Sequence, residues 1–595
     1  MANENDKPLS GAPAAGGSRR PDERTPLLPL NIFLPEIGPR KVAGLIAFFV
    51  VLAVTARSIR YLLCFPLWPD EGFLAANFIC ARFDGLLGPL AYHQVAPLFF
   101  LWTEAAAVKL LGFNEYALRV FPFLCGIGAV FLFVRVARNL LGGLPALLAV
   151  ALFAVSYYPI RHAVEIKPYS VDLAVSLLLT LGAVAWLRNP EKTAPLWALV
   201  VFAPIAVGLS FPAAFTGGGI VVALLPAAWG RLRSRIAWCC LPLTLIAGFL
   251  VVYAVSTGPQ LERESWLRKE DPATSSFNQD QAWTRTFPPL GHPGRLAAWL
   301  LRTHTGLLFA YPNGGHNGGS AATFVLFAVG AAVFFRRGRR LPLALLLSPF
   351  LFTFIAAILH RYPYGYSARF NLYLAPAICL LAGLGGARLI ALISSPRLRK
   401  PVTGAALGLL ALTGTATAAV DLFHPYKNIE DVRARDFARK FWRGQPRDVQ
   451  TVCVYRDLGI EFFPRLFQWG HSSRYLCHQE IFRDDPGGGG ATRSLRPLRV
   501  VVFSVPDRFE PYAALDEVRW RNWLETTTEE YEFVSHRRYQ VNAGIDSHHE
   551  TYDIYEFVPR PPETEKTASP EPPPLPGKPI DSAVPAGYHA VSEHR

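Results

Sequence analysis

The stretch VAGLIAFFVVLAVTARSIRYLLCFPLWPDEGF (residues 42–73) joins a long apolar run to two adjacent carboxylates. About 20 predominantly apolar residues in a helix cross the hydrocarbon core of a bilayer, and residues 42–63 meet that length. Asp70 and Glu71 follow a few residues later. Ionisable side chains at a membrane are costly unless they pair with one another or carry out a function. The stretch therefore predicts a membrane span that leads into an acidic site at one face of the bilayer.

Similar apolar runs recur along the chain as far as residue 421. Of the 595 residues, 51% are hydrophobic and only 17% are charged, whereas about a quarter of the residues of a soluble domain are charged. Further spans are expected over residues 118–138, 143–161, 168–187, 195–211, 213–230, 236–256, 320–336, 341–360, 370–393 and 402–421. The sequence thus predicts an α-helical polytopic membrane protein with about eleven spans.

Short basic clusters fall in alternate loops between these runs. They are Arg135 and Arg138, Arg188 and Lys192, the three arginines at 231, 233 and 235, RRGRR at 336–340, and RLRK at 397–400. Loops rich in Lys and Arg stay on the cytoplasmic side of a membrane. Membrane topology therefore accounts for the net charge of +14, and we expect no nucleic-acid partner.

The segment APLFFLWTEAAAVKLL (residues 96–111) decides the topology. It is short for a span and contains Glu104 and Lys109, which are costly inside lipid. If it crossed the membrane, every later basic cluster would face outward. If it lies in the interface as an amphipathic helix, those clusters all face the cytoplasm. With this second topology the outer face receives the loops 64–117, 161–167, 257–319 and 360–369.

Four parts of the chain are expected from these patterns. Residues 1–41 read as a disordered cytoplasmic tail, and the first span then acts as an uncleaved signal anchor. Residues 42–421 form the transmembrane catalytic domain. In residues 425–560, the segments VQTVCVY, LRVVVFSVP and TYDIYEFVP are typical of strands and EDVRARDFARKFW of a helix, which predicts a small α/β extracytoplasmic domain. Residues 561–595 form a disordered Pro-rich tail.

The eight cysteines are too few for a disulfide scaffold. Cys64 and Cys80, and separately Cys453 and Cys477, fall on the expected outer side, where a disulfide is permitted. The sequence leaves open whether either pair is joined. No CxxC or HxxxH spacing indicates a structural metal site.

The expected outer face collects a series of motifs in a fixed order. They are PDEG at 69–72, HQVAPLFF at 93–100, GFNEYALRV at 112–120, HAVEIKPYS at 162–170 and RYPYGYSARF at 361–370. The first four motifs resemble those of membrane glycosyltransferases with the GT-C fold, in the branch of the protein O-mannosyltransferases and lipid A aminoarabinose transferases, and the fifth resembles a loop of related bacterial membrane proteins. The resemblance covers residues 42–190 and is architectural beyond them. The sequence departs from the family pattern in two places. The two adjacent prolines expected after His93 do not occur as a pair here, and Lys167 stands where the family more often has Arg.

The resemblance implies that a sugar moves from a polyprenyl-phosphate donor to a lipid, glycan or protein acceptor at the outer face. The expected location is the bacterial plasma (inner) membrane, with the N-terminus in the cytoplasm. The attack of an acceptor on the anomeric carbon needs a base, and Asp70 is the candidate because the neighbouring Glu71 and partial burial would raise its pKa. The departing phosphate needs cations, for which Lys167 and Arg369 are the candidates.

The remaining candidates complete the predicted site. Glu165 is expected to hold the acceptor or orient Lys167, and His93 to donate a hydrogen bond. His162 and Tyr169 complete the predicted substrate-binding set. In some GT-C enzymes outer-face carboxylates hold a divalent cation. The resemblance therefore allows a metal ion at this site, and it implies no certain cofactor.

Structural interpretations of the same residues stay open. The acidic pair suits the first turn of a helix, Lys167 and Arg369 suit cations anchored at the headgroups, and His93 suits a hydrogen-bonded interfacial histidine. The tyrosines of 361–370 suit an aromatic belt.

Glu115 and Arg119 are four residues apart on one helix face, which favours a structural ion pair between them. Two other function classes also remain. A transporter or lipid flippase would show inverted repeats and charges near the midplane of the membrane. A non-catalytic relative would keep the fold and use its outer domain for binding.

Overall fold

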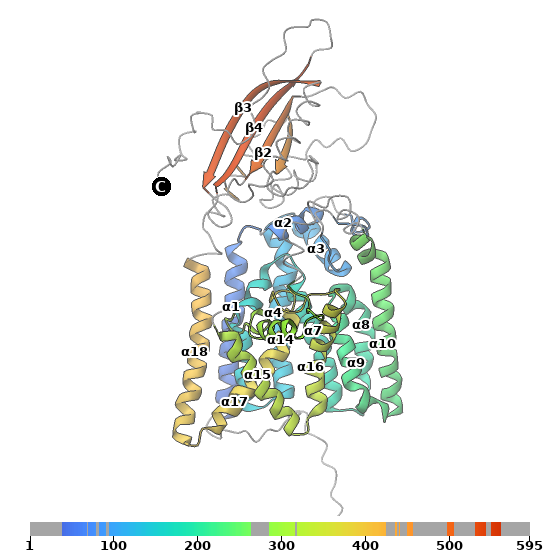
Figure 1. Ribbon diagram of the computed structural model, residues 1–595, viewed down its shortest axis with the longest axis vertical. Coiled ribbons are helices and arrows are strands. Elements are labelled where there is room, and N and C mark those ends of the chain that lie inside the picture. Colours follow the sequence, from blue (N-terminus) through green and yellow to red (C-terminus); the bar gives the residue numbers. More distant parts are fainter. Residues whose placement is uncertain are drawn as a thin grey trace, which may run out of the picture.

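The computed structural model describes residues 38–67, 69–78, 82–90, 94–262, 285–315, 318–423, 435–436, 439–440, 449–455, 497–504, 530–542 and 549–560. The terminal segments 1–37 and 561–595, and the glycine-rich segment 484–494, lie outside these residues. The helices form one upright bundle, and the strands lie beyond one of its ends (Figure 1).

The bundle contains a helix or a helix pair for each expected span. Its long helices are α1 (Pro39–Leu63), α4 (Glu115–Leu140), α5 (Gly143–Val155), α7 (Tyr169–Arg188), α8 (Ala194–Leu209), α9 (Ala213–Trp229), α10 (Leu232–Val252), α15 (Gly319–Arg336), α16 (Arg340–Ile358), α17 (Ala375–Leu392) and α18 (Pro396–Phe423). Within the described residues, eight helices are long and apolar enough to cross a membrane, and the bent pair 143–155 and 157–164 raises this to nine. The helices α8 and α9 are apolar but shorter, with 16 and 17 residues.

The centre of the bundle is built from apolar helices that pack closely. In α17, residues such as Leu380, Leu381 and Leu384 are fully buried. Glycines allow the close approach of α15 and α17, because a Cβ at Gly385 would lie 1.9 Å from the carbonyl oxygen of Leu326. Small residues at helix contacts are typical of packing in membranes. Close packing of this kind fixes the loop ends that carry the functional side chains.

A buried ion pair attaches α18 to the bundle. Arg60 of α1 pairs with Asp421 of α18, and their side chains are 2% and 7% exposed. Buried charges in a membrane bundle are tolerated when they are paired in this way. The pair therefore holds α1 beside α18, next to the end where the acidic stretch follows α1.

Short helices and single turns connect the long helices on this side of the bundle, and α2 and α3 lie at its end (Figure 1). They are α2 (Pro69–Ala75), α3 (Leu98–Leu111), α6 (Tyr157–Arg161), α14 (Pro293–His304) and the single turns Ala76–Phe78, Gly85–Leu87, His162–Val164 and Leu307–Phe309. The segment expected in the interface is thus the 14-residue helix α3. We call this end of the bundle the α2 end.

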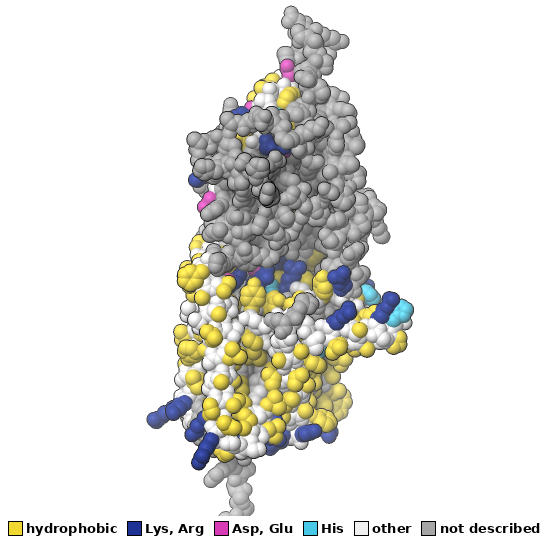
Figure 2. Space-filling model, turned by 60° about the vertical axis from the view of Figure 1, so that its left-hand side comes forward, with side chains coloured by type: hydrophobic (Ala, Val, Ile, Leu, Met, Phe, Trp, Pro, Cys, Tyr) yellow, Lys and Arg dark blue, Asp and Glu magenta, His cyan; other side chains and the backbone are white. Residues whose placement is uncertain are grey.

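The basic clusters lie at the opposite end. Arg138 and Arg188 lie in the last turns of α4 and α7, and the cluster 336–340 joins α15 to α16. In Figure 2 a row of Lys and Arg side chains lies at the lower end of the bundle, below an apolar belt. The structure therefore separates the basic loops from the acid-bearing loops, as the sequence predicted. Which end faces the cytoplasm stays a prediction.

Four strands form one mixed sheet in the C-terminal region. They are β1 (Gln450–Tyr455), β2 (Leu498–Ser504), β3 (Tyr531–Asn542) and β4 (His549–Pro559), in the order β1-β2-β4-β3. The pair β1–β2 is parallel, and β2–β4 and β3–β4 are antiparallel. Three of these strands coincide with strands expected from the sequence, and the described residues 435–436 and 439–440 of the expected helix are helical.

The strand β3 was not expected from the sequence, because charged residues interrupt its apolar pattern. Across the sheet, His536 and Arg538 both contact Asp553 of β4, and Arg537 contacts Glu556. Opposite charges on neighbouring strands stabilise a sheet. Cross-strand pairing that no local pattern reveals therefore determines this strand.

Candidate active site

A cavity of about 220 Å³ opens at the α2 end of the bundle. Its lining comes from four separate parts of the chain: α2, α6 with the turn after it and the start of α7, the turn after α14, and the loop before α17. The lining residues are Glu71, Tyr158, Arg161, His162, Glu165, Lys167, Tyr169, Leu307, Ser367, Ala368 and Arg369. Six of the eight predicted site residues are among them.

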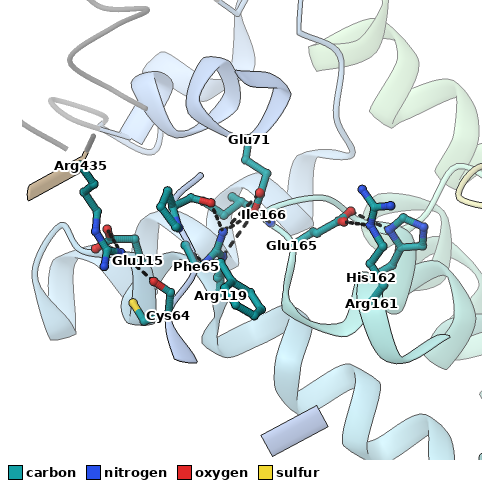
Figure 3. Close-up of polar contacts among 11 residues, drawn as sticks. Cys64, Phe65, Glu71, Glu115, Arg119, Arg161, His162, Glu165, Ile166 and Arg435 are labelled. Carbon is teal, nitrogen blue, oxygen red and sulfur yellow. Dashed lines mark hydrogen bonds and ion pairs between the residues drawn. The ribbon is translucent and has the colours of Figure 1, made fainter. Parts of the chain in front are cut away.

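Glu71 is held in place by a buried guanidinium. Its carboxylate accepts hydrogen bonds from Arg119 Nε and Nη2 at 3.1–3.3 Å, and its Oε1 also accepts from the backbone N–H of Ile166 at 2.9 Å. Both side chains are about 5% exposed. Arg119 further donates to the carbonyl oxygen of Phe65 at 2.6 Å. Figure 3 shows how these bonds tie α2, α4 and the turn at 165–166 together.

This arrangement separates the two members of the acidic pair. With both oxygens engaged by Arg119, Glu71 has the position of an anchor for the acidic stretch and not that of a free base. The backbone of Asp70 lies beside it in the first turn of α2. The side chain of Asp70 and the whole of His93 lie outside the described residues, so their expected roles stay predictions.

Glu165 lies at the centre of a second ionic cluster. Its Oε1 accepts a hydrogen bond from Arg161 Nε at 3.1 Å, and its Oε2 lies 2.6 Å from His162 Nδ1. Burial alone raises the pKa of a carboxyl, but His162 and Arg161 outweigh it here and lower the pKa of Glu165 well below its ordinary value. The group is therefore a carboxylate at neutral pH. In the described residues, His162 Nε2 has no hydrogen-bond partner.

The predicted cations lie on the same cavity. Lys167 Nζ donates to Gln94 Oε1 at 2.7 Å. This bond joins the loop of the HQVAPLFF motif to the turn at 165–167. The guanidinium of Arg369 lies 4.9 Å from the centre of the Phe370 ring. A point-like ammonium and a planar guanidinium on one cavity suit the binding of a phosphate.

Aromatic rings form a continuous wall beside these charges. His162 stacks on Tyr158 with ring centres 5.9 Å apart and meets Tyr169 edge-on at 5.3 Å. Tyr169 in turn meets Phe370 edge-on at 6.0 Å. The wall fixes the orientation of His162 and presents apolar ring surface next to the ionic groups.

The expected ion pair between Glu115 and Arg119 is wrong. Arg119 turns toward Glu71, and Glu115 accepts instead from Arg435 (Figure 3) and from Arg439. Arg435 also donates to the carbonyl oxygen of Cys64 at 2.6 Å. The sequence spacing allowed an i,i+4 contact, but Arg119 meets both carboxylate oxygens of Glu71, and the equally buried Glu115 has its own arginine partners.

Some lining residues were not among the predicted site residues. Arg161 had a recognisable signal, because it lies four residues before Glu165 in a helical turn. Leu307 and Ser367 carry no local signal, since they come to the cavity from distant parts of the chain, and Tyr158 has no charge that would single it out. They are small, apolar or aromatic residues of common type.

The described residues contain no group of three or more His, Cys, Asp and Glu side chains arranged to hold a metal ion. The side chain of Asp70 lies outside these residues. Cys64 is a free thiol. Cys80, Cys477 and the side chain of Cys453 lie outside the described residues.

Part of the chain is similar in sequence to known transferases. Residues 95–255 match the family model of dolichyl-phosphate-mannose-protein mannosyltransferases. The Bacillus subtilis (strain 168) protein named "Putative mannosyltransferase YycA" is 25% identical over 228 residues, which is 35% of this chain. The match spans about a third (32%) of the length of that relative.

Most of the chain is similar in structure to ArnT from Cupriavidus metallidurans. The crystal structures of ArnT bound to undecaprenyl phosphate and in the apo state each superpose with a TM-score of 0.50, at 14% sequence identity. The match covers 86% of this chain and 98% of ArnT. The expected GT-C fold, a helical membrane bundle with a small C-terminal sheet region, is thus confirmed.

Proposed function

We propose that this protein is an integral-membrane glycosyltransferase that moves a sugar from a polyprenyl-phosphate donor to an acceptor. The observation that carries the proposal is the single cavity that Glu71, Glu165, Lys167 and Arg369 share at the α2 end. Cations on this cavity suit the release of a phosphate, and Asp70, next to Glu71 in α2, is the proposed base for the proton of the acceptor.

The proposed chemistry assigns a separate task to each side of the site. Asp70 takes the proton of the acceptor hydroxyl or amine while the acceptor atom attacks the anomeric carbon. The bond from that carbon to the phosphate oxygen breaks, and polyprenyl phosphate leaves. Lys167 and Arg369 hold this phosphate as its negative charge grows. Glu165, ionised and fixed by Arg161 and His162, holds the acceptor at the cavity.

Two similarities support the lipid-linked donor. ArnT, which shares the fold, has been crystallised with undecaprenyl phosphate. The family model that matches residues 95–255 describes transferases that use dolichyl-phosphate-mannose, which makes mannose the first sugar to test. The matched region contains Glu165 and Lys167, whereas Asp70 and Arg369 lie on either side of it.

The distribution of basic loops supports an outward-facing site. These loops lie at the end of the bundle opposite the cavity, and basic loops remain in the cytoplasm. The cavity and the C-terminal sheet then face the extracytoplasmic side of the membrane, which we place in the plasma membrane of a bacterium. A lipid-linked donor in the outer leaflet would reach the cavity from the bilayer.

We expect the variants Lys167→Met and Arg369→Met to bind polyprenyl phosphate about 10- to 100-fold more weakly, because each removes a charged hydrogen bond worth about 1.5–3 kcal/mol. The measurement is thermal unfolding of the purified full-length protein with increasing undecaprenyl phosphate. A ligand that binds only the folded state raises the unfolding temperature. Undecaprenol, which lacks the phosphate, is expected to give no such rise.

Lys109→Met is the matched control for this experiment. Lys109 lies in α3 with its ammonium 4.1 Å from the centre of the Phe83 ring, and it does not line the cavity. This variant should retain the stabilisation by undecaprenyl phosphate. Equal stabilisation of all variants would refute the assignment of Lys167 and Arg369.

A further inference from the structure

The helix α14 (Pro293–His304) differs in direction from the helices around it. In Figure 1 it is seen nearly end-on, whereas α15 and α16 run along the long axis of the bundle. Its contacts are with the α2-end parts of both helices. Trp299 lies 6.3 Å from Phe354 of α16, and His304 lies 5.4 Å from Phe324 of α15, measured between ring centres. The helix α14 therefore crosses over their ends.

One side of α14 is attached firmly to the protein. Trp299 Nε1 donates to the carbonyl oxygen of Arg285 at 2.9 Å. Thr303 is buried against Gly365, where an added Cβ would lie 2.2 Å from Thr303 Cγ2. Gly365 has a φ of +75°, so both its conformation and this contact require glycine. These contacts join α14 to the loop that carries Arg369.

The other sides of α14 are exposed, and one of them is basic while the next is apolar. Arg295 and Arg302 are exposed and seven residues apart, so they lie on one side of the helix. Leu301 is 62% exposed, and it lies about a quarter of a turn away from Arg302. Leu290, just before the helix, is 51% exposed. A basic stripe therefore runs beside an apolar one.

The part of the sequence that contains α14 carries charge of one sign. The sequence contains no Asp or Glu from residue 281 to residue 420. Figure 2 shows a lobe at the height that α14 takes in Figure 1, with Lys, Arg and His side chains on its upper surface and hydrophobic side chains below. This lobe lies at the upper part of the apolar belt. The basic stripe thus meets the zone where lipid headgroups would lie.

We propose that α14 lies in the surface of the membrane, with Arg295 and Arg302 on the headgroups of anionic phospholipids and Leu301 in the acyl region. A helix with a basic and an apolar side beside a bilayer binds in this way, and its affinity depends on the anionic lipid content. The docking surface consists of Leu290, Arg295, Leu301 and Arg302. It is separate from the residues of the proposed transfer reaction.

The position of α14 connects this docking surface to the cavity. The helix leads directly into the turn Leu307–Phe309, and Leu307 lines the cavity. Its inner side packs on the loop that contributes Ser367 and Arg369. Binding of α14 to the leaflet therefore fixes two walls of the cavity relative to the membrane from which a lipid would enter.

Hydrogen exchange of the full-length protein tests this inference without any activity assay. The protein is placed in vesicles of phosphatidylcholine alone or with phosphatidylglycerol, and the exchange of amides in residues 293–304 is followed by mass spectrometry. Protection should rise roughly five-fold for each arginine that meets the anionic surface. In 1 M salt, screening should remove the difference between the two vesicles.

The variant Arg295→Gln with Arg302→Gln should exchange equally in both vesicles. The control variant Arg336→Gln with Arg337→Gln changes two exposed arginines at the opposite end of the bundle and should keep the dependence of α14 on phosphatidylglycerol. Equal exchange of wild-type α14 in both vesicles would overturn the inference. This outcome would leave the proposed transfer reaction untouched, because that reaction is tested by phosphate binding at Lys167 and Arg369.

Discussion

The variant Asp70→Asn is expected to transfer sugar about 10²- to 10⁴-fold more slowly than the wild-type protein, which is the usual contribution of a positioned base. Asn keeps the shape of the side chain and loses the ability to take a proton. The loss should therefore appear in kcat, while KM for the donor changes little. The measurement is the transfer of radiolabelled mannose from a synthetic polyprenyl-phosphate donor, with the protein in membranes that contain its native acceptor.

Asp84→Asn is the matched control for this prediction. Asp84 lies in the same loop, its side chain is 64% exposed, and it pairs with the exposed Arg82. This variant should transfer sugar at the wild-type rate. Asp70 would lose its role as the base if Asp70→Asn kept full activity. It would also lose that role if only KM for the donor changed.

The variant Arg119→Met is expected to destabilise the fold by about 3–5 kcal/mol, because it leaves the buried carboxylate of Glu71 without a partner. The carbonyl oxygen of Phe65, which also accepts from Arg119, would lose its donor. Thermal unfolding in detergent should show a clear fall in the midpoint temperature. The double variant Glu71→Gln with Arg119→Met should recover part of that loss, since it removes the unpaired charge.

Arg82→Met is the control for the stability measurement. It also breaks an ion pair, but the side chain of Arg82 is 84% exposed, and exposed pairs contribute little. A large loss in Arg82→Met would show that any change in this region unfolds the protein. A small loss in Arg119→Met would contradict the anchoring of the acidic stretch by the Glu71–Arg119 pair.

The helical bundle could be predicted from the sequence because its physical cause is local. A span needs a continuous apolar run of fixed length, and every expected run became a helix or a bent helix pair. Glu104 and Lys109 made residues 96–111 a costly span, and this segment forms the 14-residue helix α3; the orientation of the bundle in the membrane stays a prediction. The strand β3 could not be predicted, since its charged residues are stabilised by Asp553 and Glu556 on another strand.

The candidate site could be predicted only in part. Ionisable residues near the ends of spans stand out, because they are rare in an apolar sequence. The partners of these residues do not stand out in the sequence. Arg119 binds Glu71, 48 residues away, and not Glu115 in the same helix. Leu307 and Ser367 reach the cavity through the packing of whole helices. Such contacts depend on tertiary geometry that a single sequence does not display.

The central claim is that the cavity at the α2 end binds the phosphate of a polyprenyl donor between Lys167 and Arg369. Electron cryo-microscopy of the protein in nanodiscs with undecaprenyl phosphate tests this claim directly. We predict phosphate density within about 3 Å of Lys167 Nζ and the Arg369 guanidinium, with the prenyl chain running out into the lipid. Phosphate density elsewhere on the protein, with both cations still facing an empty cavity, would contradict it.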